Sequence, residues 1–258
     1  MIYLGDLLSG IANYMKQDLE ISGERVAVGK AEPRNEEDHV DRYNYVAPFA
    51  NGKRVLDVAC GTGFGTQILA QAGAATVHGV DIDAPAIEYA KQNHQEASVT
   101  YVVGSAGELP FSENSFEQIV SFETIEHLPD DVRSDYLDEM SRVLVAEGTL
   151  YISTPNKRIT TPWKETPNNP FHVLEYTESA LMAELEEHGF RPVKKWGQRM
   201  VPTPLTWWGP RRLVRVVEKL FGLNFKLYTV ANGRSVQSVP AWHQPRYFVW
   251  ECKKQLDK

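Results

Sequence analysis

The stretch VLDVACGTGFGT, from Val55 to Thr66, decides the fold class of this chain of 258 residues. Apolar side chains at Val55, Leu56 and Val58 predict a buried strand, and the glycines after them predict a tight turn that leads into a helix. Glycine tolerates positive φ and lets the backbone come close to a ligand. The following helix offers free N–H groups and the positive end of its dipole. The stretch therefore predicts a ligand-binding loop between a strand and a helix.

The spacing of the glycines narrows the kind of ligand. Gly61, Gly63 and Gly65 form a G-x-G-x-G pattern, which differs from the G-x-G-x-x-G pattern of dinucleotide sites. Asp57, four positions before the first glycine, would repel a pyrophosphate but could hold an ammonium group. Together these residues resemble motif I of the class I S-adenosylmethionine (SAM) methyltransferases. The resemblance implies SAM as the cofactor and disfavours a nicotinamide oxidoreductase.

Strand and helix patterns alternate after this loop, which predicts a doubly wound, mostly parallel sheet. The resemblance implies a Rossmann-like α/β fold of seven strands with an antiparallel last strand. One domain, 1–258, is expected, with an N-terminal helical cap at 1–50 and an insertion at 199–245 that covers the substrate or faces a membrane. The predicted helices are 64–73, 84–93, 131–144 and 178–188, and the predicted strands after the first are 76–81, 99–103, 116–121, 149–154, 191–197 and 246–254.

Further cofactor contacts are expected at the carboxyl ends of the strands. Asp81 ends the second strand, where an acid accepts hydrogen bonds from ribose hydroxyls, and a helix N-cap is the alternative role. The stretch GSAGELPF resembles the family's adenine-binding loop and places Ser105, where an acid is common, and Ala106 near the adenine. The remaining predicted cofactor contacts are Ile82, Phe122 and Arg42, of which Arg42 would approach the SAM carboxylate or be an ordinary solvated helix residue.

A second group of residues predicts a divalent metal site. In SFETIEHLPD, Glu123, Glu126 and His127 are spaced i, i+3 and i+4, so one helical turn would carry all three on one face. Two carboxylates and an imidazole suit a divalent cation. In NPFHVLEYT, His172 follows the fifth strand and is expected in the same crevice. The alternatives are a His127 that packs beside the cofactor and a His172 that bonds to loop backbone.

The order of these four residues resembles the small-RNA 3′-terminal ribose methyltransferases, in which four such side chains bind a metal that grips two adjacent hydroxyls. The E-x-x-E-H triplet also resembles ubiquinone-pathway quinol O-methyltransferases. The resemblance implies Mn²⁺ or Mg²⁺ held by Glu123, Glu126, His127 and His172, and methylation of one oxygen of a vicinal diol. His127 and His172 are the predicted catalytic residues, as ligands or, in the alternative, as a general base.

Charge, aromatic residues and flanking sequence bear on the substrate. The net charge of −7 argues against a nucleic-acid partner. The regions flanking the core resemble bacterial polysaccharide and glycolipid sugar methyltransferases. A sugar in such a glycan is the first expectation, a lipid-tailed catechol or quinol the second, and a non-catalytic SAM-binding protein the third; the oligomeric state is left open. Aromatic residues that suit sugar faces, with core or cap packing as the alternative, are Trp163, Trp207, Trp208 and Trp242.

The cysteine count, the N-terminal sequence and the apolar runs predict the cellular location of the protein. The two cysteines, the absence of a signal-like N-terminus and the lack of an apolar run of about 20 residues predict a cytoplasmic location. The basic amphipathic stretch 207–221 follows the pattern of a helix that rests on an anionic membrane, covers the active site or packs on the domain. Peripheral contact with the inner membrane face is therefore one expectation.

Overall fold

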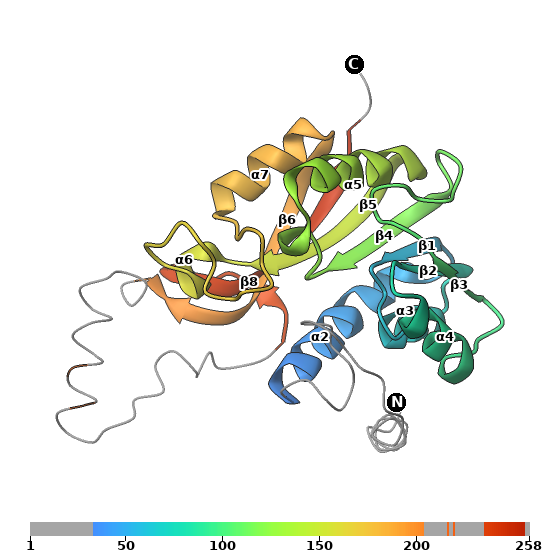
Figure 1. Cartoon of the computed structure of the whole chain (residues 1–258), viewed down its shortest axis with the longest axis horizontal. Helices are drawn as coiled ribbons and strands as arrows, with labels where there is room; N and C mark the ends of the chain where they lie inside the picture. Colours follow the sequence, from blue (N-terminus) through green and yellow to red (C-terminus); the bar gives the residue numbers. More distant parts are fainter. Residues whose placement is uncertain (1–32, 204–215, 217–218, 220–234, 256–258) are drawn as a thin grey trace.

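The computed structural model describes residues 33–203, 216, 219 and 235–255, and these are arranged around one sheet (Figure 1). The strands lie in the order β3-β2-β1-β4-β5-β8-β6-β7. Neighbouring strands from β3 to β5 are parallel, whereas β8 is antiparallel to β5 and β6, and β7 is antiparallel to β6. The strands are β1 (Arg54–Val58), β2 (Thr76–Asp81), β3 (Val99–Val103), β4 (Phe116–Phe122), β5 (Leu144–Pro155), β6 (Phe190–Pro202), β7 (Gln237–Ser238) and β8 (His243–Lys254).

Helices cover both faces of the sheet, α5 and α7 on one face and α2, α3 and α4 on the other (Figure 1). Successive strand residues point to opposite faces, so Leu56 joins the core under α5 while Val55 joins the core under α2 and α3. The helices are α2 (Pro33–Val46), η1 (Ala47–Ala50), α3 (Phe64–Gln71), α4 (Ala84–Asn93), η2 (Ile125–His127), α5 (Asp130–Val143), α6 (Lys157–Thr160) and α7 (Glu178–Glu187).

The predicted doubly wound α/β sheet with an antiparallel last strand is confirmed. The number of strands differs from the prediction. The described part of the chain has eight strands rather than seven, because the two-residue β7 pairs with the edge of β6. The strand β6 continues to Pro202, so the first residues of the predicted insertion 199–245 belong to this strand, and the insertion itself stays a prediction. The extra residues of β6 pair with the first residues of β8, which prolongs this end of the sheet.

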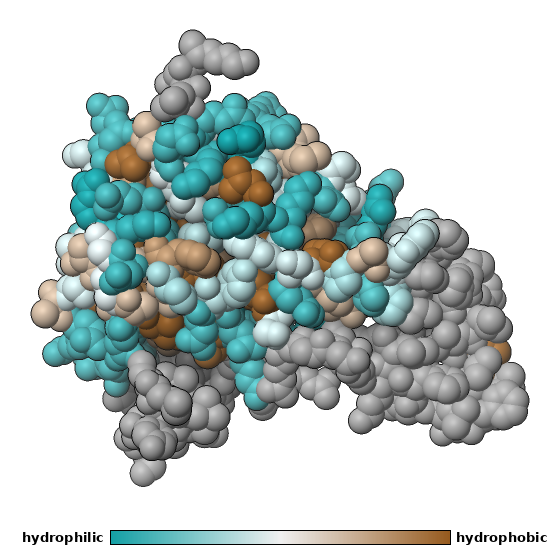
Figure 2. All heavy atoms as spheres, turned by 180° about the vertical axis from the view of Figure 1, so that it is seen from behind, coloured by the Kyte–Doolittle hydropathy of each residue, from teal (hydrophilic) through white to brown (hydrophobic). Residues whose placement is uncertain are grey.

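The predicted flanking segments are described only in part. Of the predicted cap at 1–50, residues 33–50 form α2 and η1. The basic stretch 207–221 and both of its tryptophans lie outside the described residues, apart from 216 and 219. Among the residues that are described, no helix is both long and apolar enough to cross a bilayer. On the face seen in Figure 2, hydrophobic residues are scattered among hydrophilic ones.

A buried carboxylate joins α2, β1 and α3. Asp57 in β1 is inaccessible to solvent, and its carboxylate accepts hydrogen bonds from the Tyr43 hydroxyl at 2.8 Å and the Thr66 hydroxyl at 2.6 Å. Burial raises the pKa of Asp57 to about 7, although the two hydrogen bonds oppose that rise. The ring of Tyr43 lies against Gly65, where a Cβ would be 2.1 Å from the ring, so only glycine fits.

This raised pKa makes the contribution of Asp57 to stability depend on pH. The native state holds a proton on Asp57 that the unfolded chain has lost above its ordinary pKa of 3.8, so stability falls as pH rises from about 4 to 7. Asn does not titrate, so we expect the free energy of unfolding of Asp57→Asn, minus that of the wild type, to increase with pH across this window. The increase is at most about 1.4 kcal/mol for each pH unit. Urea unfolding of both proteins at several pH values measures the difference. A difference that is constant from pH 5 to 7 would contradict the assignment.

Candidate active site

The glycine loop connects β1 to α3, as the sequence predicts. Gly61 and Gly63 have positive φ values of 54° and 85°. A Cβ on Gly63 would also lie 2.7 Å from the Ala90 Cβ and 2.8 Å from the Tyr101 hydroxyl oxygen. Both the backbone conformation and the lack of space therefore require glycine at this position. The loop ends at the N-terminus of α3, whose N-cap residue is Gly63.

Asp81 fastens this loop to the end of β2. Its carboxylate accepts a hydrogen bond from the Gly61 N–H at 2.8 Å and another from the Asp83 N–H at 2.9 Å. The alternative role of Asp81 as a helix N-cap is wrong, because Asp83 occupies that position before α4. A carboxylate has about four acceptor positions, so the two backbone contacts leave capacity for ribose hydroxyls. The contact of Asp81 with the ribose stays a prediction. Its hydrogen bond to the Gly61 N–H shows that it also holds the glycine loop in place.

Two predicted contacts for the amino-acid part of SAM are engaged inside the protein. Both oxygens of Asp57 bond within the core, so its contact with the ammonium group stays a prediction. Arg42 is buried, so its alternative as a solvated helix arginine is wrong. Its Nε donates to the Gln198 Oε1 at 2.6 Å, its Nη1 lies 3.5 Å from the Glu123 Oε1, and its guanidinium lies 4.7 Å from the centre of the Tyr247 ring. The expected approach of Arg42 to the SAM carboxylate also stays a prediction.

The other predicted cofactor contacts fall into exposed and structural positions. Ile82 is 68% exposed beside Asp81, and its contact with the cofactor stays a prediction. The Ser105 hydroxyl accepts from the Gly107 N–H at 3.1 Å and so shapes the turn that also contains Ala106. Phe122 is buried, with its ring centre 5.1 Å from that of Tyr43. For Ser105, Ala106 and Phe122 a contact with the cofactor stays a prediction.

Thr62 was missed by the sequence prediction. It lies between the first two glycines of the loop, and its buried hydroxyl oxygen has no hydrogen-bond partner among the described residues. A buried polar atom without a partner costs free energy, so such an atom in a ligand-binding loop is a candidate contact for the ligand. The signal available in the sequence was a hydroxyl residue placed between two glycines.

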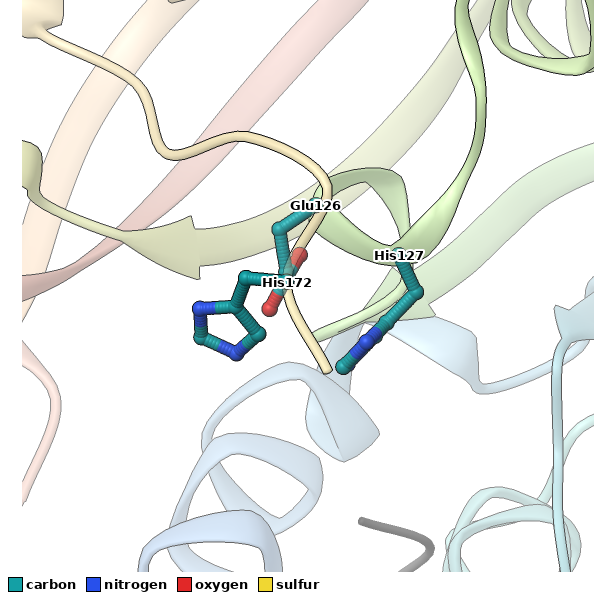
Figure 3. Close-up of side chains that lie close together, drawn as sticks. All are labelled: Glu126, His127 and His172. Atoms are coloured by element: carbon teal, nitrogen blue, oxygen red, sulfur yellow. The ribbon is translucent and has the colours of Figure 1, made fainter. Parts of the chain in front are cut away.

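Three of the four predicted metal ligands come together at the ends of β4 and β5 (Figure 3). Glu126 and His127 belong to η2, and His172 belongs to the loop between α6 and α7. The potential ligand atoms of these three residues lie within 4.8 Å of one another. In the view of Figure 3 the Glu126 carboxylate lies between the two imidazole rings, whose centres are 5.0 Å apart.

Glu123 does not share a helical face with Glu126 and His127, so that expectation was wrong. The backbone N–H of Glu123 bonds to the Ser153 carbonyl at 3.0 Å, which prolongs the pairing of β4 with β5, and its φ of 51° then turns the chain. Its carboxylate accepts from the Ser153 hydroxyl at 2.7 Å and faces Arg42. The helical turn begins only at Ile125, so the i, i+3, i+4 spacing does not apply to Glu123.

The Glu126 carboxylate is buried with only one of its two oxygens hydrogen-bonded among the described residues. It is inaccessible to solvent, and its Oε2 accepts from the Thr154 hydroxyl at 3.0 Å, while its Oε1 has no hydrogen-bond partner among the described residues. Burial, and then the nearby Glu123, raise the pKa of Glu126 well above its ordinary value. A cation at the unpartnered oxygen would compensate the ionised form, so this residue fits a metal site.

The two histidines are held through their Nδ1 atoms. The Nδ1 of His127 lies 3.0 Å from the Phe171 carbonyl oxygen, which can only accept, so Nδ1 carries the proton. The Nδ1 of His172 lies 2.9 Å from Glu175, and its Nε2 lies 2.9 Å from the amide nitrogen of Asn169. A neutral His127 therefore has its lone pair on Nε2. Ligation by His172 would replace the contact with Asn169.

Comparisons with known proteins identify the family. Residues 55–148 match the model of a methyltransferase domain family. The chain is 32% identical, over 179 residues, to a probable S-adenosylmethionine-dependent methyltransferase of Mycolicibacterium smegmatis, an overlap that covers 69% of this chain and 68% of that protein. The chain is a SAM-dependent methyltransferase. The methyltransferase family model includes the glycine loop, Asp81, Glu126 and His127, whereas His172 lies beyond it.

Two further comparisons place this methyltransferase among others. It is 33% identical over 128 residues to a ubiquinone biosynthesis O-methyltransferase of Haemophilus ducreyi, covering 46% of this chain and 53% of that protein. Its fold resembles that of a Burkholderia thailandensis 1,6-didemethyltoxoflavin-N1-methyltransferase solved with S-adenosylhomocysteine. The TM-score is 0.55 and the identity 19%, and the match covers 98% of this chain and 87% of that structure. At that identity the likeness concerns the fold alone.

The position of Asp81 predicts the effect of removing its carboxylate. Asp81→Ala loses the acceptor for the ribose hydroxyls and for the Gly61 N–H. Hydrogen bonds to a charged group contribute about 1.5–3 kcal/mol, so SAM affinity is expected to fall at least tenfold. Calorimetric titration with SAM measures this, and circular dichroism checks the fold. Asp83→Ala, two residues away, serves as the control, and unchanged SAM affinity in Asp81→Ala would refute the role.

Proposed function

We propose that this methyltransferase transfers the methyl group of SAM to one hydroxyl of a vicinal diol, and that it uses a divalent cation held by Glu126, His127 and His172. The observation that carries the proposal is the buried, unpartnered Oε1 of Glu126, which lies with two imidazoles in one three-residue group. A carboxylate and two histidines are a common ligand set for divalent transition metals.

The chemistry divides between cofactor and acceptor. SAM supplies a methyl group on a positively charged sulfonium, and the transfer forms an oxygen–carbon bond, breaks the sulfur–carbon bond and releases the hydroxyl proton. A divalent ion supplies Lewis acidity, which lowers the pKa of a hydroxyl and fixes its direction. In the protein, the glycine loop and Asp81 orient the cofactor. Glu126, His127 and His172 would hold the ion at the acceptor end through one carboxylate oxygen and one nitrogen of each imidazole ring.

A site with three protein ligands supports a chelating substrate. Glu123 is occupied by Arg42 and Ser153, so the proposed site holds three protein donors rather than the four that the family resemblance implies. An ion held by only three protein donors would have room for both oxygens of a vicinal diol. An isolated alcohol would fill only one of them, so the proposed site selects diols.

A sugar diol is the first proposal for the acceptor. Trp163 and Trp242 are 70% and 81% exposed, which removes core packing as their role. Trp163 follows α6, and Trp242 precedes β8, opposite the end of β6. Both tryptophans therefore lie on connections at the edge of the sheet where the parallel strands end, the edge at which ligands of doubly wound folds bind. Exposed indole rings suit the apolar faces of sugars.

A lipid-tailed catechol or quinol is the second candidate, and the similarity to the Haemophilus ducreyi ubiquinone biosynthesis O-methyltransferase supports it. Such acceptors also present two adjacent oxygens, so the proposed metal chemistry would be the same. The two candidates differ in the aromatic ring and the tail. Assays with a glycan-derived diol and with a catechol, at equal SAM concentration, separate them.

Removing the metal tests the first part of the proposal. Excess chelator is expected to abolish methyl transfer and leave SAM binding intact, because the glycine loop and Asp81 bind without the ion. Two imidazoles make this site less oxygen-rich than magnesium prefers, so Mn²⁺ is expected to restore turnover at lower concentration than Mg²⁺. Transfer of radiolabelled methyl measures both effects. Full activity in chelator would contradict the proposed metal requirement, and His127 or His172 would then be the candidate general base.

Changing the acceptor tests the second part. A diol and its matched deoxy analogue, which lacks the neighbouring hydroxyl, are compared at the same SAM and Mn²⁺ concentrations. We expect the analogue to lose at least tenfold in kcat/KM, because only one oxygen remains to occupy the ion. Equal kcat/KM values for diol and analogue would exclude chelation, even if the enzyme needs a metal.

A further inference from the structure

We infer that Glu175 is a positioning residue, which holds His172 in the tautomer that has its proton on Nδ1 and its lone pair on Nε2. The inference deepens the proposed function, on which its metal-binding part rests. The observation behind it is a direct contact of 2.9 Å between the Glu175 Oε1 and the His172 Nδ1. Which imidazole nitrogen carries the proton is decided by the partner of the other nitrogen.

Glu175 is buried beside His172, and both of its carboxylate oxygens have hydrogen-bond partners. Its side chain is 1% exposed, and that of His172 is 9% exposed. The Oε1 of Glu175 faces the His172 Nδ1, and its Oε2 accepts a hydrogen bond from the Thr160 hydroxyl. On the other side of the ring, the amide nitrogen of Asn169 lies 2.9 Å from the His172 Nε2. A carboxylate at Nδ1 and an amide N–H at Nε2 are both satisfied when a neutral His172 carries its proton on Nδ1.

The backbone around Glu175 fixes the spacing between this pair and Glu126. The N–H groups of Val173 and Leu174 both approach the Glu126 carbonyl oxygen, at 2.8 Å and 3.3 Å. On the other side of Glu175, the Tyr176 carbonyl accepts from the Lys157 N–H at 2.8 Å. The segment that carries Glu175 is therefore tied both to η2 and to the start of α6. His172 is held against Glu126 by main chain as well as by its side-chain partner.

The two histidines differ in the charge of their partners. His127 donates to a neutral backbone carbonyl, whereas His172 donates to a carboxylate. A carboxylate partner increases the electron density on the opposite nitrogen and makes it a stronger donor to a metal, and its loss typically costs 10–100-fold in metal affinity. The same pairing would stabilise an imidazolium if His172 acted as a base. Glu175 thus makes His172 the stronger donor of the pair.

The tautomer of His172 can be read directly and without a metal. We propose ¹⁵N NMR of the imidazole nitrogens in the full chain, with chelator and S-adenosylhomocysteine present, at a pH where the ring is neutral. His172→Gln identifies the signals by their loss. A protonated Nδ1 and an unprotonated Nε2 are expected in the wild type. A neutral ring with its proton on Nε2 would overturn the inference, whatever the metal does.

A double-mutant cycle tests whether Glu175 acts through His172. Calorimetric titration with MnCl₂ compares wild type, Glu175→Gln, His172→Ala and the double variant, with SAM affinity and thermal unfolding as checks. Glu175→Gln is expected to weaken Mn²⁺ binding 10–100-fold, with little further loss when His172 is already absent. Independent, multiplying losses would overturn the inference, because they would place the effect of Glu175 outside His172.

The control variant is Glu178→Gln, a nearby carboxylate that is 50% exposed and pairs with Lys195 on the surface. It is expected to bind Mn²⁺ as the wild type does. If the wild type binds no Mn²⁺ and ignores chelator, the proposed metal function fails. The tautomer measurement then still decides the role of Glu175. In that case the double-mutant cycle of Glu175→Gln and His172→Ala is repeated with kcat as the measured quantity.

Discussion

A carboxylate without access to water is the constraint on which the cofactor half of this enzyme depends. Asp57 accepts hydrogen bonds from a hydroxyl on α2 and a hydroxyl on α3. The helix before the sheet and the helix after the glycine loop are therefore both attached to the same residue of β1. Tyr43 then fills the space that Gly65 leaves, which fixes how closely α2 approaches the loop. These contacts fix the glycine loop relative to α2. They therefore also fix the position of Arg42, which is buried on that helix.

The proposed metal site depends on where β4 stops. Pairing with β5 continues as far as the Glu123 N–H, and the positive φ of that residue turns the chain so that η2 can begin. The turn sends Glu123 toward Arg42 and leaves Glu126 with the histidines. Two glutamates three positions apart in the sequence thus have different tasks: Glu123 pairs with Arg42, and Glu126 has an oxygen without a hydrogen-bond partner among the described residues, at the proposed metal site.

Hydrophobic periodicity was enough to predict the central strands and the helices around them, because each buries a regular stripe of apolar residues. Periodicity failed where the backbone departs from a regular element, as at Glu123, whose positive φ breaks the assumed helical turn. Residue chemistry grouped Glu126, His127 and His172, which the structure brings together, and their role as metal ligands stays a prediction. Thr62 and Glu175 escaped it, because their interest lies in a missing partner and in a tertiary contact, which neither spacing nor composition reveals.

The main-chain bonds from Val173 and Leu174 to Glu126 have a consequence for how this enzyme can diverge. They attach the loop that carries His172, which lies beyond the matched methyltransferase region, to a turn inside that region. Such bonds are indifferent to side-chain identity, so Phe171 and Val173, whose side chains are 52% and 50% exposed, are open to replacement while the loop keeps its place. Phe171 and Val173 can therefore change over evolutionary time without moving the loop that carries His172.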